Sequence, residues 1–314
     1  MRRPARRARV QPCDTETTDV TRSSRAVVRV ARGAHYVTSP VRRLPSMPGR
    51  LLTAARDFAP ARALLRRRYE RRFRTARGAG ALWGMFPSFA EARARAPDVM
   101  PVGYDTNAAG ALYRDRLDRV FPKDYPALFW LARALREESS EEPTLFDLGG
   151  HVGLSYYAFG RYLDYPPSLR WVVCDVPAVV REGAALAAAR GAPALAFTSD
   201  VRDASGAGIL LAAGSLQYIE QPLPELLAAL PSAPRHLVIN QTPTHAGPGF
   251  VTLQNIGVAV CPYRVAAEDA LPFALGALGY ELVDRWEDPA RRTTLPHQPK
   301  ASPIAYSGFY FRRR

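Results

Sequence analysis

The chain has 314 residues, of which 47% are hydrophobic, and this is enough to bury one sizeable core. Its net charge of +14 arises at one end: residues 1–80 hold 21 Lys and Arg against 5 Asp and Glu, whereas residues 81–314 hold 22 against 24. This nearly neutral body argues against a catalytic domain built to hold a nucleic-acid backbone.

The cysteine and histidine content argues against two further classes of protein. The three cysteines are scattered and odd in number, so a disulfide framework is not expected. The five histidines are also scattered, and we expect no structural or catalytic metal. No apolar run approaches the ~20 residues that span a bilayer, and the N-terminus lacks the apolar segment of a secretory signal. We therefore expect a cytoplasmic protein without a transmembrane segment.

Residues 1–80 form the basic segment. Arginine runs such as 66–68 and 71–72 alternate with Pro, Ser and Thr, and apolar residues rarely cluster. This composition predicts a disordered or weakly helical tail. The alternative is an electrostatic tether that contacts an acidic partner, such as a nucleic acid or a membrane surface.

Residues 81–140 are rich in aromatic side chains. Residues 124–136 have helical periodicity, with Leu128, Leu131 and Leu135 on one face. We expect a mostly helical cap on the substrate side of the next domain, followed by a polar linker at 137–142.

From residue 141 onward, strands and helices alternate. We expect strands at 144–147, 171–174, 195–197, 209–213 and 236–239, separated by helices at 154–163, 177–189 and 222–230. A long loop, a helix at 271–278 and strands at 280–284 and 307–311 complete the chain. The alternation predicts an α/β fold: a Rossmann-like, seven-stranded, mostly parallel sheet with an antiparallel last strand.

A glycine loop follows the first of these strands, at residues 146–153 with the sequence FDLGGHVG. Glycines allow a sharp turn and let a ligand approach without a Cβ in the way. The next helix N-terminus suits a carboxylate, and Asp147 at the strand end suits an ammonium group. The dinucleotide pattern G-x-G-x-x-G fails because its first position falls on Leu148. A plain tight turn is the alternative interpretation.

Three further segments follow the next strands. Asp175 ends the second strand and is placed to accept from both hydroxyls of a ribose, although it could instead cap the following helix. Asp200 follows the third strand and could accept from an adenine amino group. Residues 214–218 follow the fourth strand and would face an acceptor. All of them lie at the carboxyl ends of strands, where open α/β sheets bind ligands.

The arrangement resembles class I methyltransferases that use S-adenosylmethionine (SAM). More narrowly, it resembles a bacterial group of methyltransferase-like proteins often encoded near polysaccharide or natural-product genes. The matching segments are Trp83–Phe86, Ser88–Phe89, Glu91–Ala92, Gly103–Asp105, Phe146–Gly150, Ser215–Ile219, Gln241–Pro243, Gly279–Leu282 and Gly308–Phe311. The resemblance covers about residues 81–314 and implies a SAM-binding domain at 141–314.

The resemblance also implies roles for individual residues. The methionine end of SAM would lie at Asp147 and the glycine loop, the ribose at Asp175 and the adenine near Asp200. The predicted cofactor-binding residues are Asp147, Gly149, Gly150, Gly153, Asp175, Asp200, Ser215 and Leu216. His151 occupies a position that many class members fill with glycine.

Methyl transfer is an in-line displacement, in which the enzyme chiefly aligns the nucleophile with the methyl carbon. A hydroxyl acceptor also benefits from a general base, for which His151 and His245 are the candidates. The candidate residues for holding a small-molecule or glycan acceptor are Tyr104, Gln217, Tyr218, Asn240 and Gln254. The alternatives are a non-catalytic protein that retains the fold and an NAD(P)-dependent Rossmann oxidoreductase.

Overall fold

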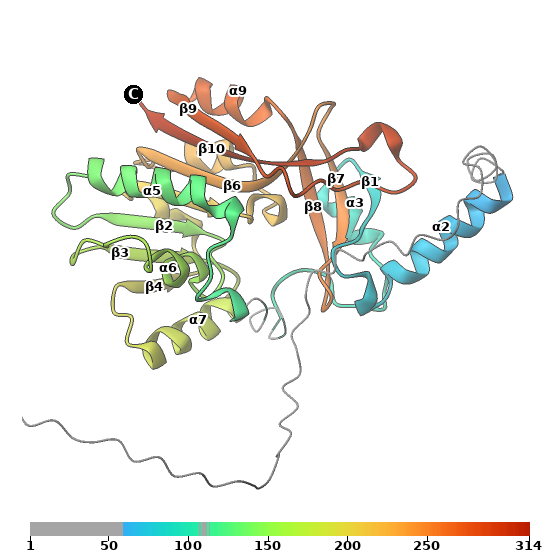
Figure 1. Ribbon diagram of the computed structural model, residues 1–314, viewed down its shortest axis with the longest axis horizontal. Helices are drawn as coiled ribbons and strands as arrows, with labels where there is room; N and C mark the ends of the chain where they lie inside the picture. Colours follow the sequence, from blue (N-terminus) through green and yellow to red (C-terminus); the bar gives the residue numbers. More distant parts are fainter. Residues whose placement is uncertain (1–58, 107, 109–111, 113) are drawn as a thin grey trace, which may run out of the picture. The chain divides into compact units, whose positions relative to one another are not determined.

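The computed structural model describes residues 59–106, 108, 112 and 114–314; the disorder expected for residues 1–58 lies outside these residues. The helices are α2 (Ala59–Phe73), α3 (Phe89–Ala94), α5 (Tyr125–Glu137), α6 (Leu154–Phe159), α7 (Pro177–Arg190), α8 (Leu223–Ala228) and α9 (Ala270–Ala277) (Figure 1). The strands are β1 (Leu82–Phe86), β2 (Thr144–Leu148), β3 (Arg170–Cys174), β4 (Leu195–Thr198), β5 (Ile209–Ala213), β6 (His236–His245), β7 (Phe250–Asn255), β8 (Val260–Ala267), β9 (Tyr280–Glu287) and β10 (Ala305–Arg313). Short 3-10 helices are η1 (Ala76–Gly78), η2 (Arg114–Arg116), η3 (Pro122–Asp124), η4 (Val201–Ala204), η5 (Leu216–Tyr218) and η6 (Pro299–Ala301).

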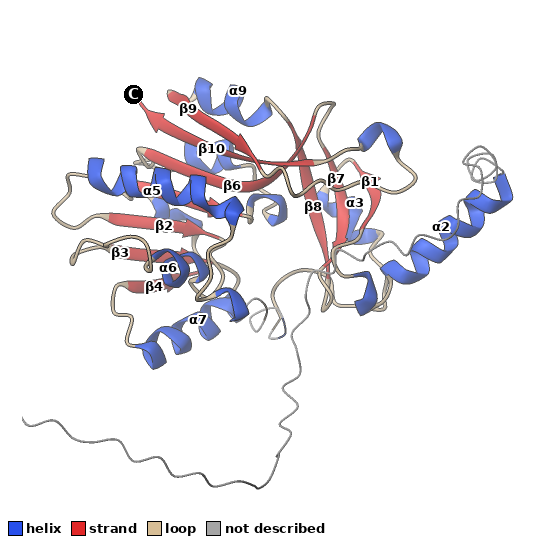
Figure 2. Cartoon of the chain, in the orientation of Figure 1, coloured by secondary structure: helices blue, strands red, loops and turns tan. Residues whose placement is uncertain are grey.

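Seven of these strands form the expected sheet. Their order is β4-β3-β2-β5-β6-β10-β9. Strands β2 to β6 pair in parallel, whereas β10 pairs antiparallel with both β6 and β9. The structure thus confirms a Rossmann-like, mostly parallel sheet whose last strand is antiparallel (Figure 2).

Helices cover both faces of this sheet because successive strand residues point to opposite sides. One face of β2 presents Leu145, which packs in a cluster with α5, α6 and part of α7. The other face presents Phe146 and Leu148, which pack in a cluster with α8 and α9. Strands buried on both faces account for the continuous apolar runs in the sequence.

Residues 246–270, expected as a long loop, contain a β-hairpin instead. β7 and β8 pair antiparallel around a turn at Gly257, whose φ is +91°. β6 is also longer than expected and reaches β8, where Thr244 pairs with Ala266. Residues 82–86, expected inside a mostly helical cap, form β1 and pair antiparallel with β7. Both strands of the hairpin are largely buried, which explains their apolar composition.

Residues 59–80, expected to belong to a disordered or weakly helical tail, form α2 and η1. Phe73 is 1% exposed and packs in a cluster with Leu253 and Val260. The Asn255 side-chain amide donates to the carbonyls of Phe73 and Thr75, at 2.6 and 2.9 Å. The folded part of the chain therefore begins before residue 80.

The helix after the glycine loop is shorter than expected. It was predicted to span 154–163, but α6 ends at Phe159 and is capped by Gly160. Such a short helix has a correspondingly small dipole, so the loop's own backbone carries more of any anion contact.

Candidate functional site

The carboxyl ends of the parallel strands lie at one edge of the sheet and are tied together there. The Gly149 amide donates to Cys174 O at 2.7 Å, which joins the loop after β2 to the end of β3. The Gly214 amide donates to Asn240 O at 2.8 Å, which joins the loop after β5 to β6. The segments predicted to bind a ligand are thus held side by side.

Two positions of the loop after β2 admit only glycine. A Cβ on Gly149 would lie 2.3 Å from Ser215 Cβ, and the Gly149 φ of +71° is itself a glycine conformation. A Cβ on Gly150 would lie 2.4 Å from the carboxylate carbon of Asp147. The loop therefore passes directly over Asp147 and against Ser215, leaving bare backbone at this point.

Asp147 lies beneath this loop. Its side chain is completely buried, and Oδ2 accepts from Trp171 Nε1 at 3.1 Å, while Oδ1 is buried without a hydrogen-bond partner among the described residues. Burial, with a smaller effect of the Asp175 charge, raises the pKa of Asp147 to about 7. Asp147 thus lies directly under Gly150, and its contact with the ammonium group of a ligand stays a prediction.

Asp175 follows β3 and links its own loop to the glycine loop. Oδ2 accepts from the His151 amide at 2.9 Å and Oδ1 from the Val176 amide at 2.8 Å. Burial raises the pKa of Asp175 to about 6, despite these two hydrogen bonds, which lower it. A carboxylate has about four acceptor positions, so about two remain for a ligand.

The alternative role of Asp175, as cap of α7, falls to another residue. The cap position is Val176, and its side chain makes no capping bond. Instead, Asp105 Oδ1 accepts from the Ala178 amide at 2.9 Å. Asp105 was not among the predicted site residues, although it lies in the matched segment Gly103–Asp105.

Asp200 is engaged with its neighbour. Oδ1 accepts from the Arg202 backbone amide at 2.9 Å, and the carboxylate pairs with the Arg202 guanidinium. The hydrogen bonds from Arg202 lower the pKa of Asp200 to about 2. The Asp200 carboxylate is therefore exposed and paired with a neighbouring cation, and its contact with an adenine stays a prediction.

The other predicted cofactor residues shape the loop. The Ser215 hydroxyl donates to Leu148 O, which fixes the loop after β5 against β2. Gly153 has a φ of +87°, and a Cβ there would lie 2.7 Å from the Leu195 side chain. Leu216 is half-buried and packs against the cluster that includes α8.

Four residues predicted on the acceptor side form one line of contacts. The Tyr104 ring lies edge-on to the His151 ring at 6.1 Å and tilted against the Tyr218 ring at 5.8 Å. The Tyr218 hydroxyl donates to Gln254 Oε1 on β7. His151 is 4% exposed and has a φ of +57°, a backbone conformation uncommon outside glycine. Four separate chain segments thus meet at this point.

Gln217 lies beside this line. Its Nε2 donates to Gly214 O at 2.7 Å, while its Oε1 is buried without a hydrogen-bond partner among the described residues. A buried oxygen of this kind remains available to a ligand donor.

The line continues through two tyrosines that sequence reasoning missed. The Tyr218 ring lies edge-on to Tyr263 of β8 at 5.4 Å, and the Tyr263 hydroxyl lies 3.0 Å from the Tyr306 hydroxyl. Tyr263 lies in the stretch that we expected to be a loop, so no periodic signal drew attention to it.

Two predicted site residues do not join this group. His245 ends β6, five residues beyond Asn240, which corresponds to roughly 16 Å along a strand. Its Nδ1 accepts from the Gly247 amide at 3.0 Å and so holds the turn before β7. The Asn240 side chain makes two hydrogen bonds: its Oδ1 accepts from Trp286 Nε1 at 3.0 Å, and its Nδ2 donates to Lys123 O at 3.2 Å. Both residues have structural partners here.

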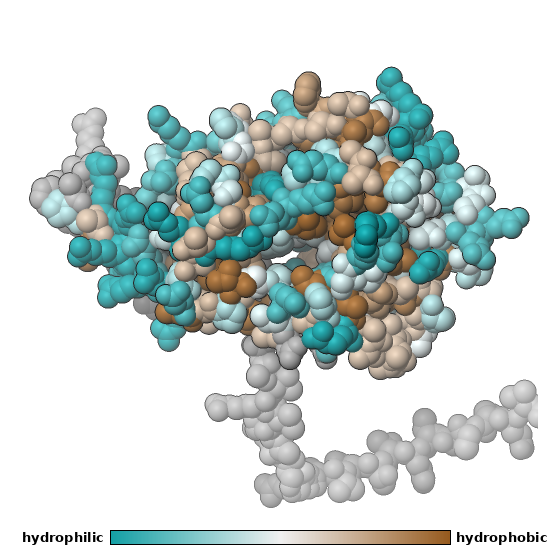
Figure 3. Space-filling model, turned by 180° about the vertical axis from the view of Figure 1, so that it is seen from behind, coloured by the Kyte–Doolittle hydropathy of each residue, from teal (hydrophilic) through white to brown (hydrophobic). Residues whose placement is uncertain are grey.

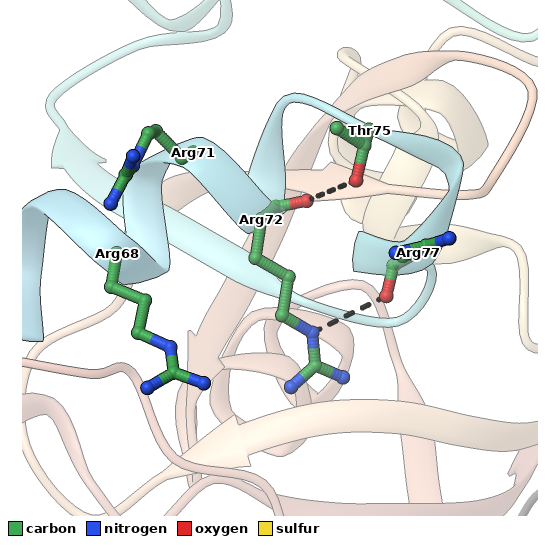
Figure 4. Close-up of a pocket in the computed structure, with 5 residues that line it drawn as sticks. All are labelled: Arg68, Arg71, Arg72, Thr75 and Arg77. Carbon is green, nitrogen blue, oxygen red and sulfur yellow. Dashed lines mark hydrogen bonds between the residues drawn. The ribbon is translucent and has the colours of Figure 1, made fainter.

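A separate hollow lies on α2 and η1. It is lined by Arg68, Arg71, Arg72, Thr75 and Arg77, as Figure 4 shows. Arg72 Nε donates to Arg77 O at 3.3 Å, while no acidic side chain lines the hollow. Hydrophilic side chains gather over this end of the molecule in Figure 3.

The described residues contain no group of three or more His, Cys, Asp or Glu side chains that could hold a metal ion. No helix among them has the length and apolarity needed to cross a membrane.

Comparisons with known proteins give matches only among solved structures. No family model matches the chain, and no curated protein matches it. One similar structure is the Burkholderia thailandensis 1,6-didemethyltoxoflavin-N1-methyltransferase with bound 1,6-didemethyltoxoflavin and S-adenosylhomocysteine. It is 21% identical with a TM-score of 0.39, and the match covers 60% of this chain and 79% of that one.

Two more solved structures are similar to this chain. The N-terminal domain of EvdMO1 with S-adenosylhomocysteine bound is 15% identical with a TM-score of 0.44, covering 63% of this chain and 83% of that one. The mitomycin 7-O-methyltransferase MmcR is 18% identical with a TM-score of 0.36, covering 61% and 54%. Because these identities and TM-scores are low, the fold assignment rests on the order and direction of the strands.

Proposed function

We propose that the protein is a SAM-dependent methyltransferase that acts on a small-molecule or sugar acceptor, at an oxygen atom. The observation that carries the proposal is the junction of Asp175 with the glycine loop. There, a carboxylate with spare acceptor positions lies beside backbone that has no Cβ, at the edge where open α/β sheets bind ligands.

The residues present fit an adenosyl sulfonium ligand. Asp175 would accept from the ribose hydroxyls, and the bare backbone at Gly149 and Gly150 would let the methionine end approach closely. Asp147 would hold the methionine end from below the loop, and Asp200 would lie towards the adenine. When bound, SAM supplies an electrophilic methyl group.

On the acceptor side, the chain's own residues would position a nucleophile. Tyr104, His151, Tyr218 and Gln254 already contact one another in series. His151 is the better candidate for a general base, because it lies in the glycine loop, whereas His245 holds a distant turn. The buried Oε1 of Gln217 could accept a hydrogen bond from the molecule that is methylated.

Isothermal titration with SAM, S-adenosylhomocysteine and NAD tests this proposal. We expect both sulfur ligands to bind the folded protein and NAD not to bind. Binding of NAD alone would favour the oxidoreductase, and binding of neither sulfur ligand would overturn the proposal. Binding without any methyl transfer to a broad panel of hydroxyl acceptors would favour the non-catalytic alternative.

We further propose that the basic segment contacts an acidic partner in the cytoplasm, as its composition suggests. The arginine hollow on α2 and η1 supports this, because clustered guanidinium groups favour anions. Arg68→Gln combined with Arg71→Gln should lower the salt concentration at which the protein leaves a polyanionic heparin column. Unchanged elution would contradict the proposal.

A further inference from the structure

Helix α2 contacts the rest of the folded part through one of its faces. The Tyr69 hydroxyl donates to Leu82 O at 2.7 Å, and the centres of the Phe73 and Trp83 rings are 5.9 Å apart. Tyr69 and Phe73 are four residues apart, so they lie on the same face of the helix. The opposite face of α2 therefore points away from these contacts.

Two leucines and three arginines lie on that opposite side. Leu64, Arg68 and Arg71 follow one another at spacings of four and three residues, and Leu65 and Arg72 lie three and four residues from Arg68. Leu64 is 63% exposed and Leu65 is 47% exposed, and the three arginines are exposed as well. In Figure 4, Arg68 and Arg72 extend to the same side of the helix. These five residues are called the outer face of α2 below.

Acids of the described residues do not compensate the charge of the outer face. Glu70 is the one acid of α2, and its carboxylate pairs with Arg66 at 2.9 Å. None of Arg68, Arg71 and Arg72 forms a salt bridge with a carboxylate of the described residues. The hollow that these arginines line contains no acidic side chain. The outer face thus combines unpaired positive charge with exposed apolar area.

The chain's own composition argues against an internal partner for this face. Residues 1–58 hold 13 Arg against 4 Asp and Glu, so their net charge has the same sign as that of α2. A second copy that docked through the same face would bring arginines against arginines, which is unfavourable. The partner must therefore supply negative charge of its own.

The leucines distinguish between two classes of acidic partner. The phosphate backbone of a nucleic acid attracts arginines, but it offers exposed leucines no apolar phase. A membrane surface with anionic lipids offers both features, because its headgroups attract arginines and apolar side chains can enter the boundary of the acyl chains. The composition of the outer face therefore favours a membrane surface.

We propose that the outer face of α2 docks on a membrane surface that contains anionic lipids. Leu64 and Leu65 enter the boundary between headgroups and acyl chains, and the three arginines contact the lipid phosphates. This inference rests on the acidic partner in the proposed function, which it identifies by chemical class, and it does not depend on methyl transfer.

The experiment measures co-sedimentation of the full chain with two kinds of vesicle. One kind is pure phosphatidylcholine, and the other contains equal parts of phosphatidylcholine and phosphatidylglycerol. We expect binding to the anionic vesicles alone, and this binding should weaken with added salt, which screens exposed charges. Leu64→Ser combined with Leu65→Ser should weaken the binding about tenfold or more, because it removes apolar area that the membrane buries.

The controls separate the leucines from the charge. The leucine variant should leave a heparin column at the same salt concentration as the wild type, because it keeps every arginine. Arg68→Gln combined with Arg71→Gln should lower both heparin retention and vesicle binding. Leu282→Ser combined with Val283→Ser removes two exposed apolar side chains of β9 and should leave vesicle binding unchanged. Thermal unfolding would confirm that each variant is folded.

Three results would overturn the inference. In the first, the wild type binds neither kind of vesicle or binds both equally. In the second, the leucine variant binds the anionic vesicles as tightly as the wild type, or the β9 variant binds them as weakly as the leucine variant. In the third, the wild type holds duplex DNA at a salt concentration that releases it from the vesicles, which would assign the face to a nucleic acid. Heparin elution that the arginine substitutions leave unchanged would instead count against the acidic partner itself.

Discussion

Asp175 is the single side chain on which the proposed cofactor site depends most. Replacing it with alanine removes the proposed ribose acceptor and also frees the His151 amide. We expect S-adenosylhomocysteine to bind about 1.5–3 kcal/mol more weakly, the range for hydrogen bonds to a charged group. Calorimetric titration would measure the loss.

Asp200→Ala is the matched control for that substitution. The Asp200 carboxylate is exposed and paired with Arg202, so its removal should cost much less affinity. Equal losses in the two variants would contradict the distinction, and an unchanged affinity for Asp175→Ala would leave Asp175 with a structural role only.

Asp147 should make stability depend on pH. Its pKa in the folded protein is raised to about 7, well above its ordinary value of 3.8. Between these values the folded state binds more protons than the unfolded state, so the free energy of unfolding should fall as pH rises from about 4 to 7. Asp175, with its pKa raised to about 6, contributes in the same direction.

Asp147→Asn should flatten this dependence and make the protein more stable than the wild type at pH 8. Urea unfolding of both proteins at pH 5 and pH 8 would measure it. Parallel pH profiles for the two proteins would show that the carboxylate is not held protonated by the fold.

At the scale of elements, Asp105 should stabilise α7 from outside the helix. It accepts from the Ala178 amide in the first turn, and loss of such a cap typically costs about 1 kcal/mol. For a folded part of this size, Asp105→Ala should lower the thermal midpoint by about 2–4 °C. The exposed Asp98 provides the control, and equal shifts for Asp98→Ala and Asp105→Ala would argue against a capping role.

At the scale of the whole molecule, the boundary of the folded part can be tested by truncation. Deletion of residues 1–58 should leave the affinity for S-adenosylhomocysteine unchanged. Deletion of residues 1–80 should lower the thermal midpoint, because it removes buried Phe73 and the backbone carbonyls that Asn255 binds. Calorimetry and thermal unfolding of both truncated proteins would check this, and equal stability would contradict the packing of Phe73.

Sequence patterns predicted the seven-stranded sheet well, for a local reason. Strands buried on both faces show as short apolar runs, and glycines and prolines mark the ends between them. The glycine loop at 149–153 and Asp175 are features of this kind, since each follows a strand end directly. The common edge of parallel strands then brings these positions together.

Other features were decided only by contacts between distant residues. The hairpin of β7 and β8 pairs with β1 on one side and β6 on the other, and its own sequence gave no clear period. Asp147 lies beneath the loop, where its carboxylate accepts a hydrogen bond from Trp171 of the next strand, β3. His245 was expected in the long loop after residues 236–239 as a candidate base, but it ends the extended strand β6 and accepts a hydrogen bond from the Gly247 amide.

The sequence by itself therefore determined the order of elements, the glycine turn and the acidic residues at strand ends, because neighbouring residues specify these through periodicity and backbone freedom. The tertiary structure alone decided which acid is buried beneath the glycine loop, which links two loops and which caps a helix. Those outcomes depend on burial and on charges that lie far apart in the chain, and no local pattern records them.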